Sequence, residues 1–156
     1  MNAVCEKNYD LHSPIPTRAS KDVIFNLAEE MRRDLNLRSG MQLQCIVEAN
    51  GGKIVYPGLL EDDQSTALHV RADGSFQINL CHLRSISQNN FIIAHELGHF
   101  VLHWPKVREA YENASMVARK NAPEDDKDLV RCDWEANWFA AGLLMPKDEF
   151  LKVYHD

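Results

Sequence analysis

The chain has 156 residues, of which 45% are hydrophobic and 26% are charged. This length supports one domain with its own hydrophobic core, and the composition is ordinary for a globular protein. The formal net charge of −6 argues against direct nucleic-acid binding, which usually requires a basic surface. No apolar run approaches the length of a membrane span, and the first ten residues lack the pattern of a secretory signal. Four scattered cysteines without a C-x-x-C pair are typical of a reduced, cytoplasmic protein.

The N-terminal part of the chain predicts a lead-in followed by a helix. Residues 1–19 contain Pro14 and Pro16 and are expected to be extended, whereas residues 20–156 are expected to form the single domain. Ser20 is a suitable N-cap for a helix over 21–36. The apolar residues of this helix recur at helical spacing and predict a buried face: Val23, Ile24, Leu27, Ala28, Met31 and Leu35.

Strand-like runs separated by turn residues follow, at 41–49, 53–57, 66–72 and 75–80. The last two runs alternate apolar and polar residues on either side of Asp73-Gly74, which predicts a hairpin. We therefore expect an α+β fold in which a small antiparallel sheet of three or four strands packs against helices.

The second half of the chain predicts helices. The stretch FIIAHELGHFVLH, residues 91–103, is expected to lie in a helix that Ser87 caps and that ends at Trp104-Pro105, because a residue before proline disfavours helical geometry. Another helix is expected over 106–120. An acidic loop then leads to a last helix over 131–144, whose Trp134 and Trp138 are expected in the core.

His95, Glu96 and His99 form an H-E-x-x-H pattern within this apolar helix. Residues four apart lie on one helix face, so both imidazoles can bind one metal ion, while Glu96 lies beside it as a general base. The alternative is a polar helix face without metal. An ionised glutamate among apolar neighbours would then lack compensation for its desolvation, which favours the metal. Gly98 in a helix interior also indicates close approach of another backbone or of substrate.

A catalytic zinc site usually has three protein ligands and one open position, so a third ligand is needed. His103 lies a further four residues along, but three ligands in a row along one helix cannot surround an ion. The stretch CDWEANWFAAGLLMP supplies better candidates on a second helix. Spacing alone ranks them Glu135, Asp133 and then Cys132, and Glu135 could instead complement the helix N-terminus.

Two motifs, FIIAHELGHFVLH and EANWFAAGLLMP, resemble the ImmA/IrrE metallo-endopeptidase family over roughly residues 20–150. The resemblance implies a zincin-like fold with the H-E-x-x-H helix at its core. It implies Zn²⁺ held by His95, His99 and Glu135, with Glu96 as the catalytic base. It also suggests Asn137 as a residue that supports the metal ligands. His103 and Tyr111 remain candidates for supporting a ligand or stabilising the transition state.

The resemblance further implies a protein substrate, in particular a helix-turn-helix transcriptional repressor or antitoxin. The chain would then be an anti-repressor of a phage, a mobile element or a toxin–antitoxin-like module. The alternative is a binding protein without proteolytic activity, which sequesters a DNA-binding regulator and uses zinc only to hold its helices together. Hydrolysis of a non-protein amide is a third hypothesis, which the second motif disfavours.

Overall fold

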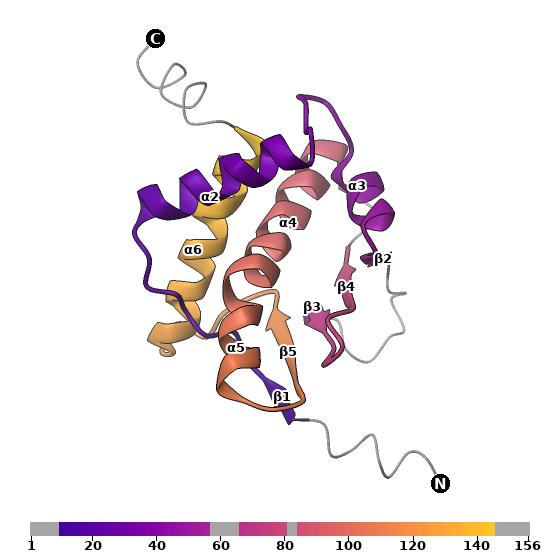
Figure 1. Cartoon of the computed structure of the whole chain (residues 1–156). Helices are drawn as coiled ribbons and strands as arrows, with labels where there is room; N and C mark the ends of the chain where they lie inside the picture. Colours follow the sequence, from indigo (N-terminus) through magenta and orange to yellow (C-terminus); the bar gives the residue numbers. More distant parts are fainter. Residues whose placement is uncertain (1–9, 57–65, 81–83, 146–156) are drawn as a thin grey trace, which may run out of the picture.

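The computed structural model describes residues 10–56, 66–80 and 84–145, and these residues form an α+β fold, as expected. Residues 1–9 of the expected lead-in and residues 146–156 of the expected domain lie outside the described part of the chain. Figure 1 shows helix α4 crossing the middle of the molecule, with α2 and α6 on one side of it and the strands on the other.

The described strands form one mixed sheet of five strands in the order β1-β5-β3-β4-β2. Strand β3 is antiparallel to β4 and β5, whereas β1 is parallel to β5 and β2 is parallel to β4. The expected small antiparallel sheet is therefore wrong. Two strands come from segments without a strand pattern, the lead-in and the expected helix over 106–120, and tertiary pairing decides their conformation. The strands are β1 (Asp10–His12), β2 (Lys53–Val55), β3 (Thr66–Val70), β4 (Phe76–Asn79) and β5 (Ala114–Arg119).

The hairpin between β3 and β4 is confirmed. Val70 pairs with Phe76, and the Arg71 N–H donates to the Ser75 carbonyl at 2.8 Å. Gly74 has a φ of +90°, which glycine adopts without steric cost, and the Asp73 carboxylate accepts the Ser75 N–H at 2.9 Å. The Asp-Gly signal thus has the expected physical basis.

Helix α2 (Lys21–Asp34) begins where the sequence predicts. The Ser20 hydroxyl accepts the Val23 N–H at 3.3 Å and so caps the helix. The buried face is narrower than expected, because Val23 and Leu27 are 57% and 38% exposed. The buried residues of α2 are Ile24, Phe25 and Ala28.

Helix α3 (Leu43–Ala49) replaces the strand expected over 41–49. Leu43, Ile46 and Val47 are three and four residues apart, which is helical spacing, and Leu43 and Val47 are buried. The apparent alternation at the start of this run covers too few residues to outweigh that spacing.

Helix α4 (Ile86–Gly98) carries the H-E-x-x-H pattern and is capped by Ser85, not Ser87, in a capping box with Gln88. The helix does not end at Trp104-Pro105. It continues through a π-helical turn, η1 (His99–His103), into α5 (Trp104–Ala110). The Trp104 N–H bonds to the His99 carbonyl across this wide turn. Pro105 then falls in the first turn of α5, where a missing N–H is tolerated.

Helix α6 (Lys127–Leu144) packs closely across α4 and α2. A Cβ atom on Gly98 would lie 3.0 Å from the Ala136 Cα, so only glycine allows the two backbones to approach this closely. This contact supplies the reason for Gly98 and places residues 133–137 of α6 next to the histidines of α4. Trp134 does not pack into the core as expected, because it is 54% exposed.

Candidate metal centre

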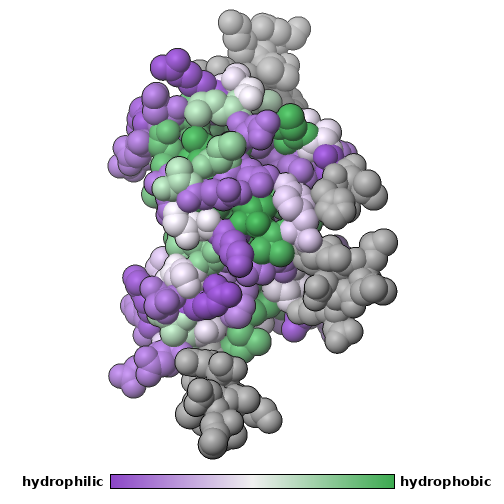
Figure 2. Space-filling model, turned by 90° about the vertical axis from the view of Figure 1, so that its right-hand side faces the viewer, coloured by the Kyte–Doolittle hydropathy of each residue, from purple (hydrophilic) through white to green (hydrophobic). Residues whose placement is uncertain are grey.

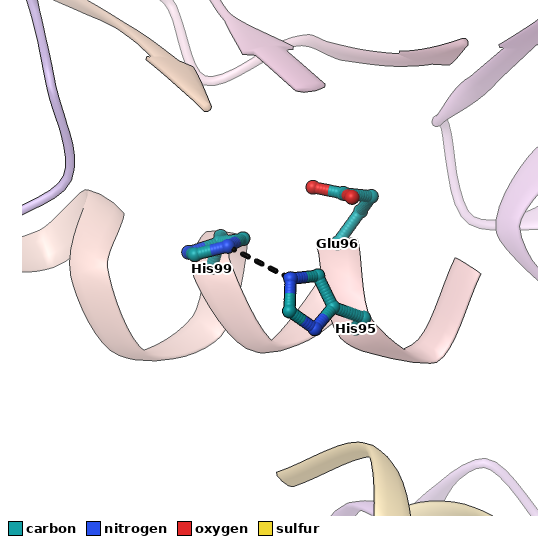
Figure 3. A group of neighbouring side chains, drawn as sticks. All are labelled: His95, Glu96 and His99. Atoms are coloured by element: carbon teal, nitrogen blue, oxygen red, sulfur yellow. Dashed lines mark hydrogen bonds between the residues drawn. The ribbon is translucent and has the colours of Figure 1, made fainter. Parts of the chain in front are cut away.

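Helix α4 brings His95, Glu96 and His99 together, with one ligand atom of each within 4.8 Å of the others. The two histidines lie on successive turns, and their Nε2 atoms are 3.2 Å apart. In Figure 3 the Glu96 carboxylate lies beside the two imidazole rings rather than between them. His99 and Glu96 are buried, at 2% and 4% exposure, while the His95 side chain is 18% exposed.

The carboxylate that faces these two rings belongs to Asp133. Its Oδ1 atom lies 3.5 Å from His95 Nε2 and 3.3 Å from His99 Nε2. Glu135, which the sequence ranked first, is not brought to this cluster. Residues two apart on a helix differ by about 200° around its axis, so Asp133 and Glu135 point to different faces of α6.

His95 Nε2, His99 Nε2 and Asp133 Oδ1 are spaced as the ligands of one small divalent cation would be. Two ligands bound at about 2.0–2.1 Å with tetrahedral angles are about 3.3–3.4 Å apart. The observed separations of 3.2, 3.3 and 3.5 Å agree with that value. Two imidazoles and one carboxylate are also a ligand set that divalent transition metals accept.

The contacts of His95 favour its protonated form. His95 Nδ1 lies 2.8 Å from the Asn137 amide oxygen, which can only accept, so Nδ1 carries a hydrogen. Burial lowers the pKa of His95, but the Asp133 carboxylate, Glu96 and Asn137 together raise it above its ordinary value. Without a metal, these contacts favour a proton on His95 Nε2, the atom that faces Asp133.

His99 is held neutral. Burial lowers the pKa of His99 to about 4, although the Asp133 carboxylate acts in the opposite direction. The Asp133 carboxyl shows the complementary effect: burial raises its pKa, but contacts with His95 and His99 hold it well below its usual range. The centre therefore combines an ionised carboxylate with an unprotonated imidazole.

Glu96 is poised to exchange a proton. Burial raises the pKa of Glu96 to about 7; Asp133 adds a smaller increase, while His95 and Lys120 act in the opposite direction. Its Oε1 atom is buried and has no hydrogen-bond partner among the described residues. An unsatisfied buried carboxylate oxygen is costly in a purely structural role, and it indicates a group that acts on a ligand.

Glu135 is fully buried and contacts His103 rather than His95 or His99. Its Oε1 atom accepts from the Thr17 N–H (3.0 Å) and hydroxyl (2.8 Å) and contacts His103 Nε2 (2.9 Å). Its Oε2 atom accepts from the Arg18 N–H and Arg131 Nε, both at 2.9 Å. Five donors thus satisfy this carboxylate and leave it no capacity to bind a metal in this arrangement. Burial raises its pKa, but these bonds lower it well below the usual range.

The remaining predicted residues have other surroundings. Cys132 is buried, and burial together with the nearby carboxylates raises the pKa of its thiol, which disfavours a thiolate ligand. Tyr111 follows α5 and stacks on His12 with 3.7 Å between ring centres. No described contact joins Tyr111 to His95 or His99. His103 supports His99 from behind, with 3.0 Å between their Nδ1 atoms.

Two cavities border the centre and would allow a ligand to reach it. A cavity of about 310 Å³ is lined by His95, Glu96 and Phe91, and Phe91 is 45% exposed. A second cavity of about 110 Å³ borders His99 and Asp133. Asn121 lines both. Figure 2, turned by 90° from the view of Figure 1, shows hydrophobic residues near the middle of that face, with hydrophilic residues around them.

Sequence reasoning ranked Asp133, the facing carboxylate, second to Glu135 and missed Thr17 and Arg18 altogether. A signal for Asp133 was present, because it lies four residues before Asn137 and therefore shares a face of α6 with it. Thr17 and Arg18 are more than one hundred positions from Glu135 in the chain. No local pattern could have indicated that contact.

Comparison with known proteins identifies one family. Residues 62–156 match the family model Peptidase_M78, described as the IrrE N-terminal-like domain. No curated protein and no solved structure matches the chain significantly. None of the helices in the described part of the chain is long and apolar enough to cross a membrane.

Proposed function

Because the chain belongs to the IrrE N-terminal-like peptidase family, we propose that it is a zinc-dependent endopeptidase. The observation that carries this proposal is the convergence of His95, His99 and Asp133 on one point, with Glu96 beside it. Zinc is the natural occupant, because it accepts two imidazoles and a carboxylate and keeps a fourth position open in catalytic sites.

His95, His99 and Asp133 would hold the zinc ion. This assignment replaces Glu135 by Asp133, because five donors already surround the Glu135 carboxylate. When bound, zinc would supply a Lewis acid that lowers the pKa of water and polarises the scissile carbonyl. Asn137 would orient His95, since a hydrogen bond to the second ring nitrogen fixes the direction of a ligating imidazole.

Glu96 would act as the general base and then as the general acid. It would accept a proton from the attacking water on its carboxylate and donate that proton to the amine that leaves the peptide. A carboxyl whose pKa is raised toward neutrality suits both roles, because it accepts and releases a proton near neutral pH. Its unpartnered Oε1 atom gives the water a place to bind.

The proposed substrate is a protein, namely a helix-turn-helix repressor or antitoxin, as the family resemblance implies. The cavities of about 310 and 110 Å³ on either side of the centre support binding of a chain that passes across it. Release of the repressor's target genes would then follow from cleavage rather than from sequestration.

The test is to co-express the chain with the helix-turn-helix regulator encoded nearest to its gene and to measure the regulator's intact mass. Wild type should shorten the regulator, and Glu96→Gln should leave it intact while keeping bound zinc. Glu124→Gln, which changes an exposed glutamate in the loop before α6, is the matched control and should cleave like wild type. Cleavage by Glu96→Gln would overturn the role of Glu96. An intact regulator that co-purifies with both wild type and Glu96→Gln would support sequestration instead.

A further inference from the structure

A buried chain of side chains runs through the molecule and ends on His99. It passes from Glu135 Oε1 to His103 Nε2 over 2.9 Å, and from His103 Nδ1 to His99 Nδ1 over 3.0 Å. Glu135 and His103 are completely buried, and His99 is 2% exposed. Water is therefore excluded from these links, and each link determines where the next ring carries its hydrogen.

The positions of the hydrogens follow from the Glu135 carboxylate, which is ionised and only accepts. His103 Nε2 must therefore carry a hydrogen. The Nδ1 atoms of His103 and His99 lie 3.0 Å apart, so one of them donates and the other accepts. A neutral His99 that binds a metal through Nε2 carries its hydrogen on Nδ1, so the acceptor is the lone pair of His103 Nδ1. His99 Nδ1 must then donate to it, which leaves His99 Nε2 unprotonated and directed toward His95 and Asp133.

The N-terminal segment completes the surroundings of Glu135. The N–H groups of two successive residues, Thr17 and Arg18, bind different oxygens of this carboxylate, and the Thr17 hydroxyl adds a third bond. Arg18 has a φ of +64°, which is uncommon for a residue other than glycine and persists only where surrounding contacts impose it. Both residues lie outside the segment that matches the family model, residues 62–156.

We propose that Glu135 and His103 are positioning residues that fix the tautomer of His99, and that Thr17 and Arg18 clamp the N-terminal segment onto them. The inference rests on the proposed metal centre, since it assigns these residues a purpose only if His99 is a ligand. A histidine ligand that donates its other N–H to a fixed partner keeps its orientation. Here the partner of His99 is a second histidine, His103, and the Glu135 carboxylate bonds to His103 rather than to His99.

The first test locates the imidazole hydrogens by nitrogen-15 NMR of the full-length protein, before and after addition of zinc. We expect His103 to carry its hydrogen on Nε2 and His99 to carry its hydrogen on Nδ1 in both states. Both hydrogens should exchange slowly with water, because their environment is buried. A hydrogen on His99 Nε2 in the metal-free protein, or on His103 Nδ1, would overturn the inference without any variant.

The second test measures zinc affinity by competition with a chelator in folded variants. His103→Leu should weaken zinc binding by about 10–100-fold, which is the range for loss of a residue that supports a ligand. His99 should then occupy both tautomers, a change that loss of packing alone would not produce. An unchanged zinc affinity together with an unchanged His99 tautomer would overturn the inference.

Variants of the clamp provide a milder test if His103→Leu does not fold. Thr17→Val removes one hydroxyl donor but keeps the shape, and it should weaken zinc binding by less than His103→Leu does. Thr17→Ser should restore the affinity. The matched control is Asp128→Asn, because Asp128 pairs with the exposed Arg18 side chain and not with Glu135. An equal loss in Thr17→Val and Asp128→Asn would contradict the clamp.

These readouts separate the inference from the proposed function. A protein that binds zinc with the expected tautomers but leaves every regulator intact would contradict the peptidase and preserve the positioning chain. A protein that cleaves its regulator but shows the opposite tautomers would contradict the positioning chain and preserve the peptidase.

Discussion

Helix α6 carries two carboxylates two residues apart, and their surroundings are opposite. Asp133 is 29% exposed at its side chain and faces the Nε2 atoms of His95 and His99. Glu135 is fully buried and accepts from five donors. One carboxylate is incompletely satisfied and lies next to possible metal ligands, while the other is saturated by the protein itself. The comparison teaches that burial alone does not identify a metal ligand. A carboxylate can bind a metal only if its oxygen atoms are not already occupied by hydrogen-bond donors of the protein.

The largest effect on stability is expected at the saturated carboxylate. Glu135→Ala leaves Arg131 Nε and the N–H groups of Thr17 and Arg18 without this acceptor, and removal of one partner from a buried ion pair costs about 3–5 kcal/mol. Urea denaturation of the metal-free protein should show this loss. A change below about 0.5 kcal/mol, typical of surface positions, would contradict the assignment of Glu135 as a structural anchor.

Asp133→Ala should reduce zinc affinity more than it reduces the stability of the metal-free protein. Zinc affinity should fall by more than the roughly 100-fold that a supporting residue contributes, because a direct ligand is lost. The metal-free protein should lose less stability than Glu135→Ala does, since the Asp133 side chain is 29% exposed and only its contacts with His95 and His99 among the described residues are lost. Isothermal titration with zinc measures the first effect. Unchanged affinity would show that Asp133 is not a ligand.

The contribution of His99 to the stability of the metal-free protein should fall in mildly acidic solution, whereas Glu96, whose pKa is raised to about 7, contributes in the opposite direction. The pKa of His99 is lowered to about 4 in the folded state from 6.5, so folding excludes its proton. The contribution of neutral His99 is fully present above pH 6.5 and is lost as the pH falls toward 4. Glu135 and Asp133, whose pKa values are also lowered, add losses at lower pH. In urea denaturation at pH 8 and pH 4.5, wild type should lose more stability, or gain less, than His99→Gln on going to pH 4.5.

The smallest effect is expected where the two helices meet. Gly98→Ala improves helix propensity by about 1 kcal/mol but places a methyl group 3.0 Å from the Ala136 Cα. Overpacking costs about 1–3 kcal/mol, so a net destabilisation of about 1 kcal/mol is expected. Zinc affinity should fall as well, since α6 must move and take Asp133 with it. A stabilised variant with wild-type affinity would contradict the close approach of α4 and α6.

Local sequence signals predicted the elements whose conformation is decided locally. The Asp73-Gly74 hairpin, the Ser20 cap and the H-E-x-x-H helix have side chains that determine their own backbone geometry. The apolar residues of the short run over 41–49 fit the spacing of a strand as well as that of a helix. Burial of Leu43 and Val47 against the core favours the helix. Strands β1 and β5 exist through pairing with distant partners, so no local pattern could have revealed them.

The part of the candidate site that lies in one helical segment was predictable from the sequence, whereas the part that depends on packing between segments was not. His95, Glu96 and His99 lie within five consecutive residues of one helical segment, so their spacing alone brings them together. The choice between Asp133 and Glu135 depends on which face of α6 meets α4, and the contact of Gly98 with Ala136 determines that. The partners of Glu135 include Thr17 and Arg18, whose place depends on the path of the N-terminal segment across the fold.

The measurement that tests the central claim most directly is anomalous X-ray diffraction at the zinc edge from crystals of the zinc-loaded protein. We expect one strong peak between His95 Nε2, His99 Nε2 and an Asp133 carboxylate oxygen, at about 2.0–2.2 Å from each. Glu135 should remain bonded to Thr17 and His103. A zinc ion bound by Glu135, or no peak beside His95 and His99, would contradict the account.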